Sequence, residues 1–433
     1  MPNPGGKNGH GEKNPPPDDD LYAAFLKYAR QNMTQEQELV ALRKDFGYHI
    51  GLTSLKKLRK RLEIPSVRTQ KLEVETVTQA VIEEVEKDPA HSHGPAFIKD
   101  QLRLKMLFAP RYLIRKIMVE QYPDGFDVRF PGRKNHRVIR VRLHASGPYF
   151  EISSDGHEKL APSALRMGGV GFSISGFKDK FTDYVVFLKI FPDVRTSGAG
   201  GHIFLDFVED TGCIPIQLTT DKGSEVGWLY AFMAALRYIL SKFNISFAEI
   251  YFRAAYAPDI DLNLYPFHVL IKSIHNMVIE GFWRHFKEKL GLNLKDFLLR
   301  GKTEHLFNTH NPLHEPLFYW IFAPLIQQEL DDFVNWWNNH RVRHQHEKIM
   351  PSGHVPSHAM EYPELFGALD CRIRVPPEAI EELRMQINLE EGPKSKFQAW
   401  TGLTEEFDLY ASRVFLDIGA PKLTMEKGWD VFV

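Results

Sequence analysis

The sequence predicts an α/β protein in which a mixed sheet is covered by helices and preceded by a helical region. Two observations lead to this fold class. Residues 34–122 carry apolar side chains at helical spacing, whereas from residue 149 onward strand-like segments alternate with helical ones. The 433-residue chain, with 43% hydrophobic and 25% charged residues, has the composition of a globular protein with two or three domains.

The N-terminal part is expected to begin with a tail and to continue into helices. Residues 1 to about 20 are rich in Gly, Pro, Asn and Asp and cannot bury a core, so we predict a disordered tail over residues 1–33. Thr34 is a suitable N-cap for a helix that ends at Gly47. A second, strongly basic helix is expected over residues 54–62.

The same helical pair recurs further along the chain. Residues 97–107 and 110–122 form a second pair, and its second helix is again basic. Two helices of this kind are typical of helix-turn-helix DNA-binding motifs, although a plain helical bundle with solvated basic faces has the same pattern. We therefore treat residues 34–148 as a helix-turn-helix-like DNA-binding region. Its candidate DNA contacts are Lys56, Lys57, Arg59, Lys60, Arg111, Arg115 and Lys116.

Charge is distributed unevenly along the chain. Residues 41–148 contain 22 Lys and Arg against 12 Asp and Glu, while the remainder contains 32 basic and 43 acidic residues. A basic front half joined to an acidic rear half favours contact of the front half with a polyanion, but a chance imbalance of surface charge would look the same.

Several classes of protein are excluded by simpler features. The two cysteines, Cys213 and Cys371, lie far apart and predict neither a disulfide framework nor a zinc knuckle. No apolar run is long enough to span a membrane, and the N-terminus lacks an apolar signal core. We expect a protein of a reducing compartment, the cytosol or the nucleus.

The catalytic part is expected over residues 149–365. Three consecutive strands are followed by alternating helices and strands and then by helices, which describes a mixed sheet covered by helices. This order matches the ribonuclease-H-like fold, although periodicity alone does not separate it from other α/β folds. The expected strands are 149–155, 170–176, 184–191, 214–220 and 249–254, and the expected helices are 201–211, 226–243, 273–290 and 324–341.

Three carboxylates stand at distinctive places in this pattern. Asp155 ends the first strand and precedes Gly156, Asp221 ends the fourth strand, and Glu280 lies inside a helix. If the first and fourth strands are neighbours, their ends bring the two aspartates together, and a crossing helix brings Glu280 to the same point. An isolated Asp before Gly is more often a turn residue, and an isolated helical Glu is more often solvated. The hypothesis of a shared site therefore depends on the order in which the three occur: strand end, strand end, helix.

Phosphodiester chemistry explains why these residue types would be gathered. Two Mg²⁺ ions about 4 Å apart activate the attacking oxygen and stabilise the leaving oxygen. Mg²⁺ prefers oxygen ligands and keeps several waters, so a few carboxylates are enough to hold it. Three crowded carboxylates would repel one another without the metal, which favours a functional reason for their presence.

Five motifs in this order resemble the integrase core domains of fungal and animal genomes, within the retroviral-integrase and DDE-transposase superfamily. The resemblance covers roughly residues 140–365 and implies that Asp155, Asp221 and Glu280 are the catalytic and metal-binding residues. Val278 departs from the basic residue common in the family, and the 59 positions from Asp221 to Glu280 exceed the spacing of retroviral integrases. The motifs are SSDGHEKL (153–160), GFKDKFTDYVVFLKIF (176–191), LTTDKGSEV (218–226), SIHNMVIEGFW (273–283) and WWNNHRVRHQHEKIMPSGHVP (336–356).

The resemblance implies a DDE-type polynucleotidyl transferase that cleaves and transfers DNA strands with two Mg²⁺ or Mn²⁺ ions. Expected partners are double-stranded DNA, as element ends and target, and further copies of the chain; the expected location is the nucleus. Further candidate DNA contacts are Asn276, His340, Arg341 and Arg343, although positive charge at a helix end also has a purely structural explanation.

Two other functions stay open at this stage. A catalytically inactive, domesticated copy would only bind DNA or partners, and a ribonuclease-H-like nuclease would cut RNA–DNA hybrids with the same carboxylates. Residues 366–433 are expected to form a small helical C-terminal region without visible chemistry.

Overall fold

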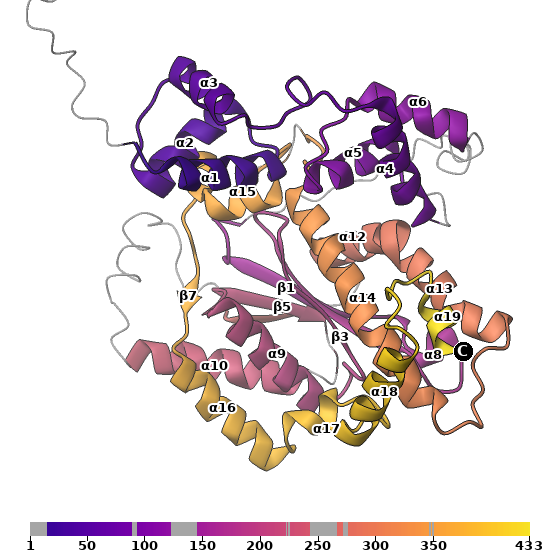
Figure 1. The fold of residues 1–433 in the computed structure, drawn as a ribbon. Helices are drawn as coiled ribbons and strands as arrows, with labels where there is room; N and C mark the ends of the chain where they lie inside the picture. The colour runs from indigo at the N-terminus through magenta and orange to yellow at the C-terminus, as the bar shows by residue number, and fades with distance from the viewer. Residues whose placement is uncertain are drawn as a thin grey trace, which may run out of the picture.

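The computed structural model describes residues 15–88, 93–122, 145–221, 223, 226–242, 266–271, 276–345, 348 and 350–433. Its centre is a five-stranded mixed sheet with the order β3-β2-β1-β5-β6 (Figure 1). Strands β1, β2 and β3 are antiparallel neighbours, whereas β5 and β6 run parallel to β1. The predicted α/β class is confirmed, and the sheet is consistent with a ribonuclease-H-like fold. The strands are β1 (Glu151–Leu160), β2 (Phe172–Asp179), β3 (Val185–Phe191), β5 (Gln217–Asp221) and β6 (His268–Ile271).

Helices cover both faces of the sheet, which explains why every residue of β2 is buried. Phe177 and Phe187 pack toward α9 (Ser197–Thr211) and α10 (Val226–Lys242), while Ile174 and Leu188 pack toward the helices of the opposite face. Along β2, Ile174 therefore enters one hydrophobic cluster and Phe177 the other, as the period of two in a strand requires. The opposite face is covered by α12 (Met277–Phe286) and α14 (His314–Asn339).

Two elements of the core differ from their predicted bounds. The helix expected over 273–290 is divided into α12, a π-helical turn over Lys287–Gly291 and α13 (Leu292–Thr303). Helix α14 begins ten residues before Pro324, which the sequence suggested as its start. Buried apolar side chains on both sides of the proline, Ile321 and Ile326, keep the two halves of α14 packed on the sheet. The strand expected over 249–254 lies outside the described residues.

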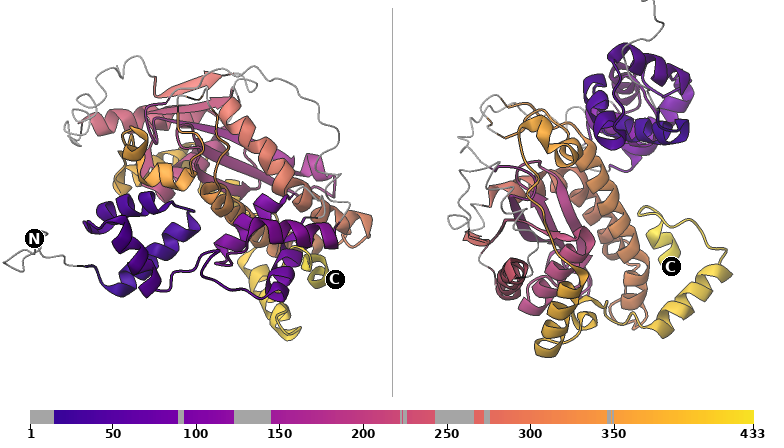
Figure 2. Two further views of the ribbon diagram at one scale, coloured as in Figure 1. Left: turned by 90° about the horizontal axis from the view of Figure 1, so that it is seen from above. Right: turned by 90° about the vertical axis from the view of Figure 1, so that its left-hand side faces the viewer.

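The N-terminal helices form two groups with separate cores. The first group, α1 (Asp18–Arg30), α2 (Gln35–Phe46) and α3 (Leu52–Arg61), surrounds Phe25 and Tyr28 and lies as a lobe beside the sheet (Figure 2). The second group, α4 (Val74–Glu86), α5 (Pro95–Leu104) and α6 (Arg111–Gln121), joins the cluster of α14. The two helix pairs expected from the sequence are thus present, but they belong to two helical groups with separate cores, whereas residues 34–148 were expected to form one region.

The predicted tail over residues 1–33 is wrong for residues 18–30. This segment forms α1, because Leu21, Phe25 and Tyr28 share one buried face at helical spacing. Three aspartates in the first turn favour the helix through its dipole. Thr34 caps α2 and Gly47 ends it, as predicted, and Thr34 and Gln37 form a capping box.

The C-terminal segment is helical, as expected, and it spreads over the core. Helices α16 (Pro377–Glu390) and α17 (Lys394–Gln398) lie against α9, while α18 (Glu405–Asp417) and α19 (Gly428–Phe432) lie against α14. A second small sheet pairs β4 (Cys213–Ile214) with β7 (Ile373–Arg374). No helix among the described residues is both long and apolar enough to cross a bilayer.

The indole of Trp429 fixes the last helix to the core. It is fully buried against Phe318 and Phe322, donates a hydrogen bond of 2.7 Å to the Phe297 carbonyl, and fills the space left by Gly301. We predict that Trp429→Ala lowers the free energy of unfolding by about 3–5 kcal/mol, because it removes a large buried side chain and leaves a cavity. Chemical denaturation measures the change, and a loss below about 1 kcal/mol would show that α19 contributes little to stability.

Candidate active site

Asp155 and Asp221 lie at matching positions on two adjacent parallel strands. Ser153 of β1 is opposite Thr219 of β5, and each aspartate follows two residues later, so both belong to the same face of the sheet. Both line one cleft of about 330 Å³. The neighbouring strands therefore bring these two carboxylates to one place, as the sequence predicted.

The reason for Gly156 differs from the one inferred from the sequence. Asp155 does not end its strand, because β1 continues to Leu160 and stays paired with β2 beyond this point. A Cβ atom at Gly156 would lie 3.1 Å from a methyl carbon of Val194. Glycine therefore allows close packing against the segment before α9, since a side chain here would require Val194 to shift, and the predicted strand end at Asp155 is wrong.

Helix α12 carries Glu280 and crosses β1 beside Asp155. Asn276 precedes the helix and donates a hydrogen bond of 3.3 Å to the Ser154 carbonyl. One turn after Glu280, the indole Nε1 of Trp283 donates a hydrogen bond of 2.9 Å to Oδ2 of Asp155. Two contacts on either side of Glu280 thus join the helix to the strand that carries Asp155.

The electrostatics of Asp155 connect all three carboxylates. Burial, followed by the negative charges of Asp221 and Glu280, raises the pKa of Asp155 to about 7. Hydrogen bonds from the Gly156 amide and the Trp283 indole oppose this shift and stabilise the ionised form. The negative charges of Asp221 and Glu280 therefore reach Asp155 and disfavour its ionised form.

The metal-binding arrangement expected from the sequence is only partly present. Within the part of the chain that the structure describes, no three His, Cys, Asp or Glu side chains are grouped closely enough to hold a metal ion. Residues 222, 224–225 and 272–275, which adjoin Asp221 and α12, lie outside that part. The catalytic assignment of Asp155, Asp221 and Glu280 stays a prediction.

The chemistry of the donors nevertheless fits a hard divalent cation. Each carboxylate oxygen of Asp155 accepts one hydrogen bond, Oδ1 from the Gly156 amide at 2.8 Å and Oδ2 from Trp283. A carboxylate oxygen has further acceptor capacity, so both oxygens can still coordinate an ion. A bound cation would also relieve the repulsion that raises the pKa of Asp155.

Comparison with known protein families addresses this part of the chain directly. Residues 266–355 match the family of the integrase core domain. The match supports the retroviral-integrase and DDE-transposase superfamily, in agreement with the resemblance drawn from the motifs. It includes Glu280 and Trp283 and begins after Asp155 and Asp221, and no curated protein matches the chain.

Two residues beside Asp155, Trp283 and His157, were not anticipated as part of the site. Trp283 follows Glu280 by three positions, a spacing that places both on one side of a helix and was the available signal. His157 is buried and stacks on Trp283 with ring centroids 4.8 Å apart. Burial and the nearby Lys159 and Lys287 lower the pKa of His157 to about 4, so the imidazole is neutral near pH 7 and supports the indole.

The basic residues of α3 divide into two kinds. Lys56, Lys57 and Lys60 are exposed and suited to contact phosphate, and their role in DNA binding stays a prediction. Arg59 instead forms an ion pair with Glu38, whose side chain is only 3% exposed. Arg59 therefore has a structural role inside the first helical group, where its guanidinium neutralises a buried carboxylate, and its contact with DNA stays a prediction.

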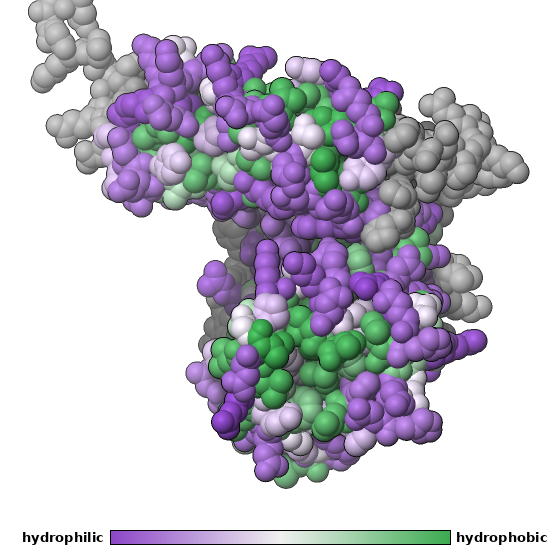
Figure 3. Space-filling view, turned by 45° about the vertical axis from the view of Figure 1, so that its right-hand side comes forward, coloured by the Kyte–Doolittle hydropathy of each residue, from purple (hydrophilic) through white to green (hydrophobic). Residues whose placement is uncertain are grey.

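The remaining DNA-contact candidates also differ in their surroundings. Arg111, Arg115 and Lys116 on α6 are exposed, and Lys116 lies 3.8 Å from Glu120. In Figure 3 the upper part of the molecule, which includes the N-terminal helices, is mainly hydrophilic, in keeping with a surface that faces water or a polyanion. The DNA-binding role of these three residues is untested.

The candidates at the end of α14 and before α12 also differ in their surroundings, and their contact with DNA stays a prediction. His340 stacks on Trp336 with ring centroids 4.7 Å apart, and burial lowers its pKa to about 4, so it carries no charge for a phosphate. Asn276 is 2% exposed, and its hydrogen bond to the Ser154 carbonyl attaches the start of α12 to β1. Arg341 and Arg343 are exposed, and Arg341 also donates a hydrogen bond of 2.7 Å to the Gly353 carbonyl.

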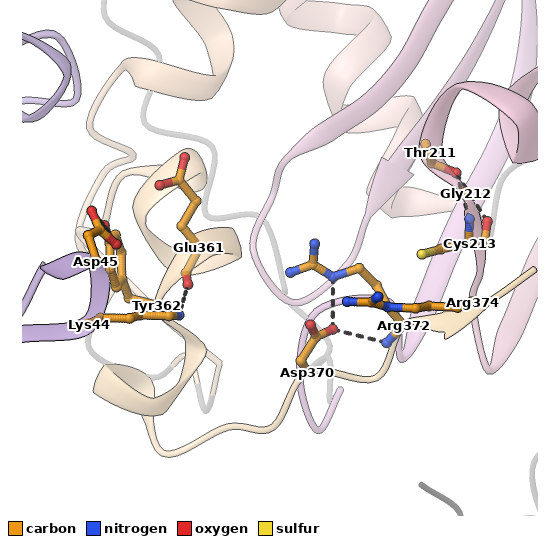
Figure 4. A pocket seen from close by; sticks show the side chains of 10 residues that line it. All are labelled: Lys44, Asp45, Thr211, Gly212, Cys213, Glu361, Tyr362, Asp370, Arg372 and Arg374. Atoms are coloured by element: carbon orange, nitrogen blue, oxygen red, sulfur yellow. Dashed lines mark hydrogen bonds and ion pairs between the residues drawn. The ribbon is translucent and has the colours of Figure 1, made fainter. Parts of the chain in front are cut away.

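A larger cavity of about 790 Å³ lies away from the carboxylates, between the first helical group and the β4–β7 sheet (Figure 4). Its charges are largely paired: Lys44 bonds to the Glu361 carbonyl, Asp45 accepts from Tyr362, and Arg372 pairs with Asp370 at 2.9 Å. None of the three predicted catalytic residues lines it. The cleft that contains Asp155 and Asp221 is therefore the candidate active site.

The raised pKa of Asp155 predicts how its charge affects stability. The folded-state pKa of about 7 exceeds the ordinary value of 3.8, so the unfolded chain ionises first and folding becomes less favourable as pH rises between these values. In the presence of EDTA, Asp155→Asn should raise the thermal unfolding midpoint by several degrees at pH 8 and have little effect at pH 4. An equal effect at both pH values would contradict the electrostatic explanation.

The Arg59–Glu38 pair leads to a prediction about stability rather than DNA binding. Arg59→Ala should destabilise the protein by about 3–5 kcal/mol, because it leaves the buried Glu38 carboxylate without its partner. Lys60→Ala, on the exposed side of the same helix, is the matched control and should change stability by less than about 0.5 kcal/mol. Denaturant titration of both variants measures this, and equal stabilities would refute the structural role of Arg59.

Proposed function

We propose that the chain is a DDE-type polynucleotidyl transferase that cleaves DNA strands and transfers them to a target. One observation above all supports it: Asp155 and Asp221 lie at matching positions on paired strands and line one cleft, and α12, which carries Glu280 within the residues that match the integrase core domain, is hydrogen-bonded to Asp155. A costly concentration of like charge beside a cleft is a feature of functional sites more than of stable cores. The substrate we propose is double-stranded DNA.

In this proposal Asp155, Asp221 and Glu280 would together hold Mg²⁺ or Mn²⁺. When bound, two such ions would activate the attacking water or 3′-hydroxyl and stabilise the leaving oxygen. The protein supplies the surroundings: Phe177, Val194 and Leu229 line the cleft with apolar groups. Apolar walls lower the local dielectric and strengthen the attraction between the carboxylates and a cation.

The exposed basic residues of α3 and α6 provide the proposed contacts with the DNA backbone, through charges that carry no sequence information. We further propose that the protein works as an oligomer in the nucleus, because strand transfer joins two element ends to nuclear DNA. Arg341 and Arg343, exposed after the end of α14, would add further contacts with the DNA backbone.

A second candidate is a catalytically inactive copy that only binds DNA or partners. It is favoured by the absence, among the described residues, of a group of three side chains arranged to hold a metal, and by Val278 at a position that is commonly basic in the family. The two proposals differ in whether Asp155, Asp221 and Glu280 are required for DNA cleavage or affect only the stability of the protein.

Nicking of supercoiled plasmid in Mn²⁺ tests the proposal without knowledge of the element ends. Asp155→Asn, Asp221→Asn and Glu280→Gln should each lower the rate by at least about 100-fold, because each removes part of the charge that would hold the ions. Asp210→Asn is the control, since Asp210 lies on α9 and pairs with Lys189 at the surface.

The outcomes separate the candidates. Loss of nicking in the three variants but not in the control supports the transferase. If wild type and the three variants are equally inactive, with plasmid binding retained in gel-shift assays, the inactive copy is correct. An RNA–DNA hybrid cut faster than duplex DNA would indicate a ribonuclease instead.

A further inference from the structure

We propose that Trp283 is a positioning residue of the active site: it orients the carboxylate of Asp155 and anchors α12 so that Glu280 faces the same cleft. This inference rests on the proposed function, because it assigns Trp283 a role in building a metal site. The tryptophan itself would touch neither DNA nor ion.

The first argument is the way the Asp155 carboxylate is held. Its two oxygens accept from donors on different elements, Oδ1 from the backbone amide of Gly156 at 2.8 Å and Oδ2 from the indole of Trp283 at 2.9 Å. Because one donor belongs to β1 and the other to α12, the carboxylate can satisfy both only in a narrow range of orientations. The hydrogen bond from Trp283 thus fixes the direction of the remaining lone pairs.

The second argument is that the indole is itself held firmly. Trp283 is 5% exposed and packs against the His157 ring, 4.8 Å away, and the Phe286 ring, 5.7 Å away. A donor that is locked by its neighbours loses little entropy when it makes its hydrogen bond, and this is the usual requirement for a residue that supports a site.

The third argument comes from the strand beside Asp155. Gly176 of β2 is the direct partner of Asp155 in the β1–β2 ladder. A Cβ atom at position 176 would lie 2.9 Å from Cη2 of Trp283. The indole therefore lies over a glycine, and it can reach across β2 to Asp155 only because this position has no side chain.

The fourth argument concerns Glu280. It precedes Trp283 by three residues in α12, so these two side chains lie on adjacent turns of the helix, and Asn276 is the residue just before the helix begins. Asn276 bonds to the Ser154 carbonyl and Trp283 bonds to Asp155, so both anchors engage adjacent residues of β1. The position of Glu280 relative to Asp155 is set by these two contacts.

The test compares two tryptophan-to-phenylalanine variants. Trp283→Phe keeps the aromatic packing and removes only the N–H donor. Trp320→Phe is the matched control, because Trp320 of α14 also donates a hydrogen bond of 2.9 Å to a carboxylate oxygen, Oδ1 of Asp408 on α18. Neither residue lines the cleft that contains Asp155 and Asp221. Mn²⁺ affinity by titration calorimetry should fall about tenfold in Trp283→Phe and stay at the wild-type value in Trp320→Phe.

Two further readouts separate positioning from general stability. In nicking assays, Trp283→Phe should lower kcat with little change in KM for plasmid, while its thermal unfolding midpoint matches that of Trp320→Phe. In EDTA, amide hydrogen exchange of residues 277–286 should rise in Trp283→Phe and stay unchanged in Trp320→Phe. Gly176→Ala should reproduce the loss of Mn²⁺ affinity, because its methyl group displaces the indole.

Failure of the inference can be told apart from failure of the proposed function. If wild type binds Mn²⁺ and Trp283→Phe binds it equally tightly, the positioning role is overturned while the transferase stands. If wild type binds no Mn²⁺, the transferase fails, and hydrogen exchange in EDTA still decides whether Trp283 anchors α12. In either case, unchanged amide hydrogen exchange of residues 277–286 in Trp283→Phe would show that Trp283 does not anchor α12.

Discussion

The parallel pairing of β1 with β5 is the constraint on which the site depends. Because Ser153 is opposite Thr219, the residues two positions further along both strands share a face, and both are aspartates. A slip of this register by one residue would turn one of the two carboxylates to the other face of the sheet. The hydrophobic clusters on the two faces prevent such a slip, since Ile152 and Leu218 would lose their place in the core.

Gathering these carboxylates in one place is electrostatically unfavourable, and the packing of the rest of the core must compensate for the lost stability. Burial beside two other carboxylates makes ionisation of Asp155 unfavourable, and the amide of Gly156 and the indole of Trp283 compensate only in part. A protein under selection for stability alone would place an apolar side chain at such a position. The dense aromatic packing around α12 and α14 supplies the rigidity that keeps the carboxylates near one another.

Much of the core could be predicted because the strands and helices repeat with simple periods. The order of elements and the places of Asp155 and Asp221 follow from that pattern, and the Thr34 cap follows from local chemistry. Helix α1 was missed because its acidic start resembles the polar tail before it, and its buried face finds its partners, which include α2, α3 and Tyr362, only in three dimensions. The surroundings of Arg59 and His340, beside Glu38 and Trp336, likewise depend on tertiary contacts that a basic motif does not reveal. The role of Gly176 opposite Asp155 is likewise visible only in the sheet.

The central claim is that Asp155, Asp221 and Glu280 share a divalent cation at the edge where β1, β5 and α12 meet. A crystal structure of the wild-type protein with Mn²⁺, with anomalous scattering recorded from the metal, tests it most directly. The account predicts an anomalous peak within coordination distance of oxygens from all three side chains. A well-ordered cleft with no peak, or a peak that leaves any one of the three carboxylates out of contact, would contradict it.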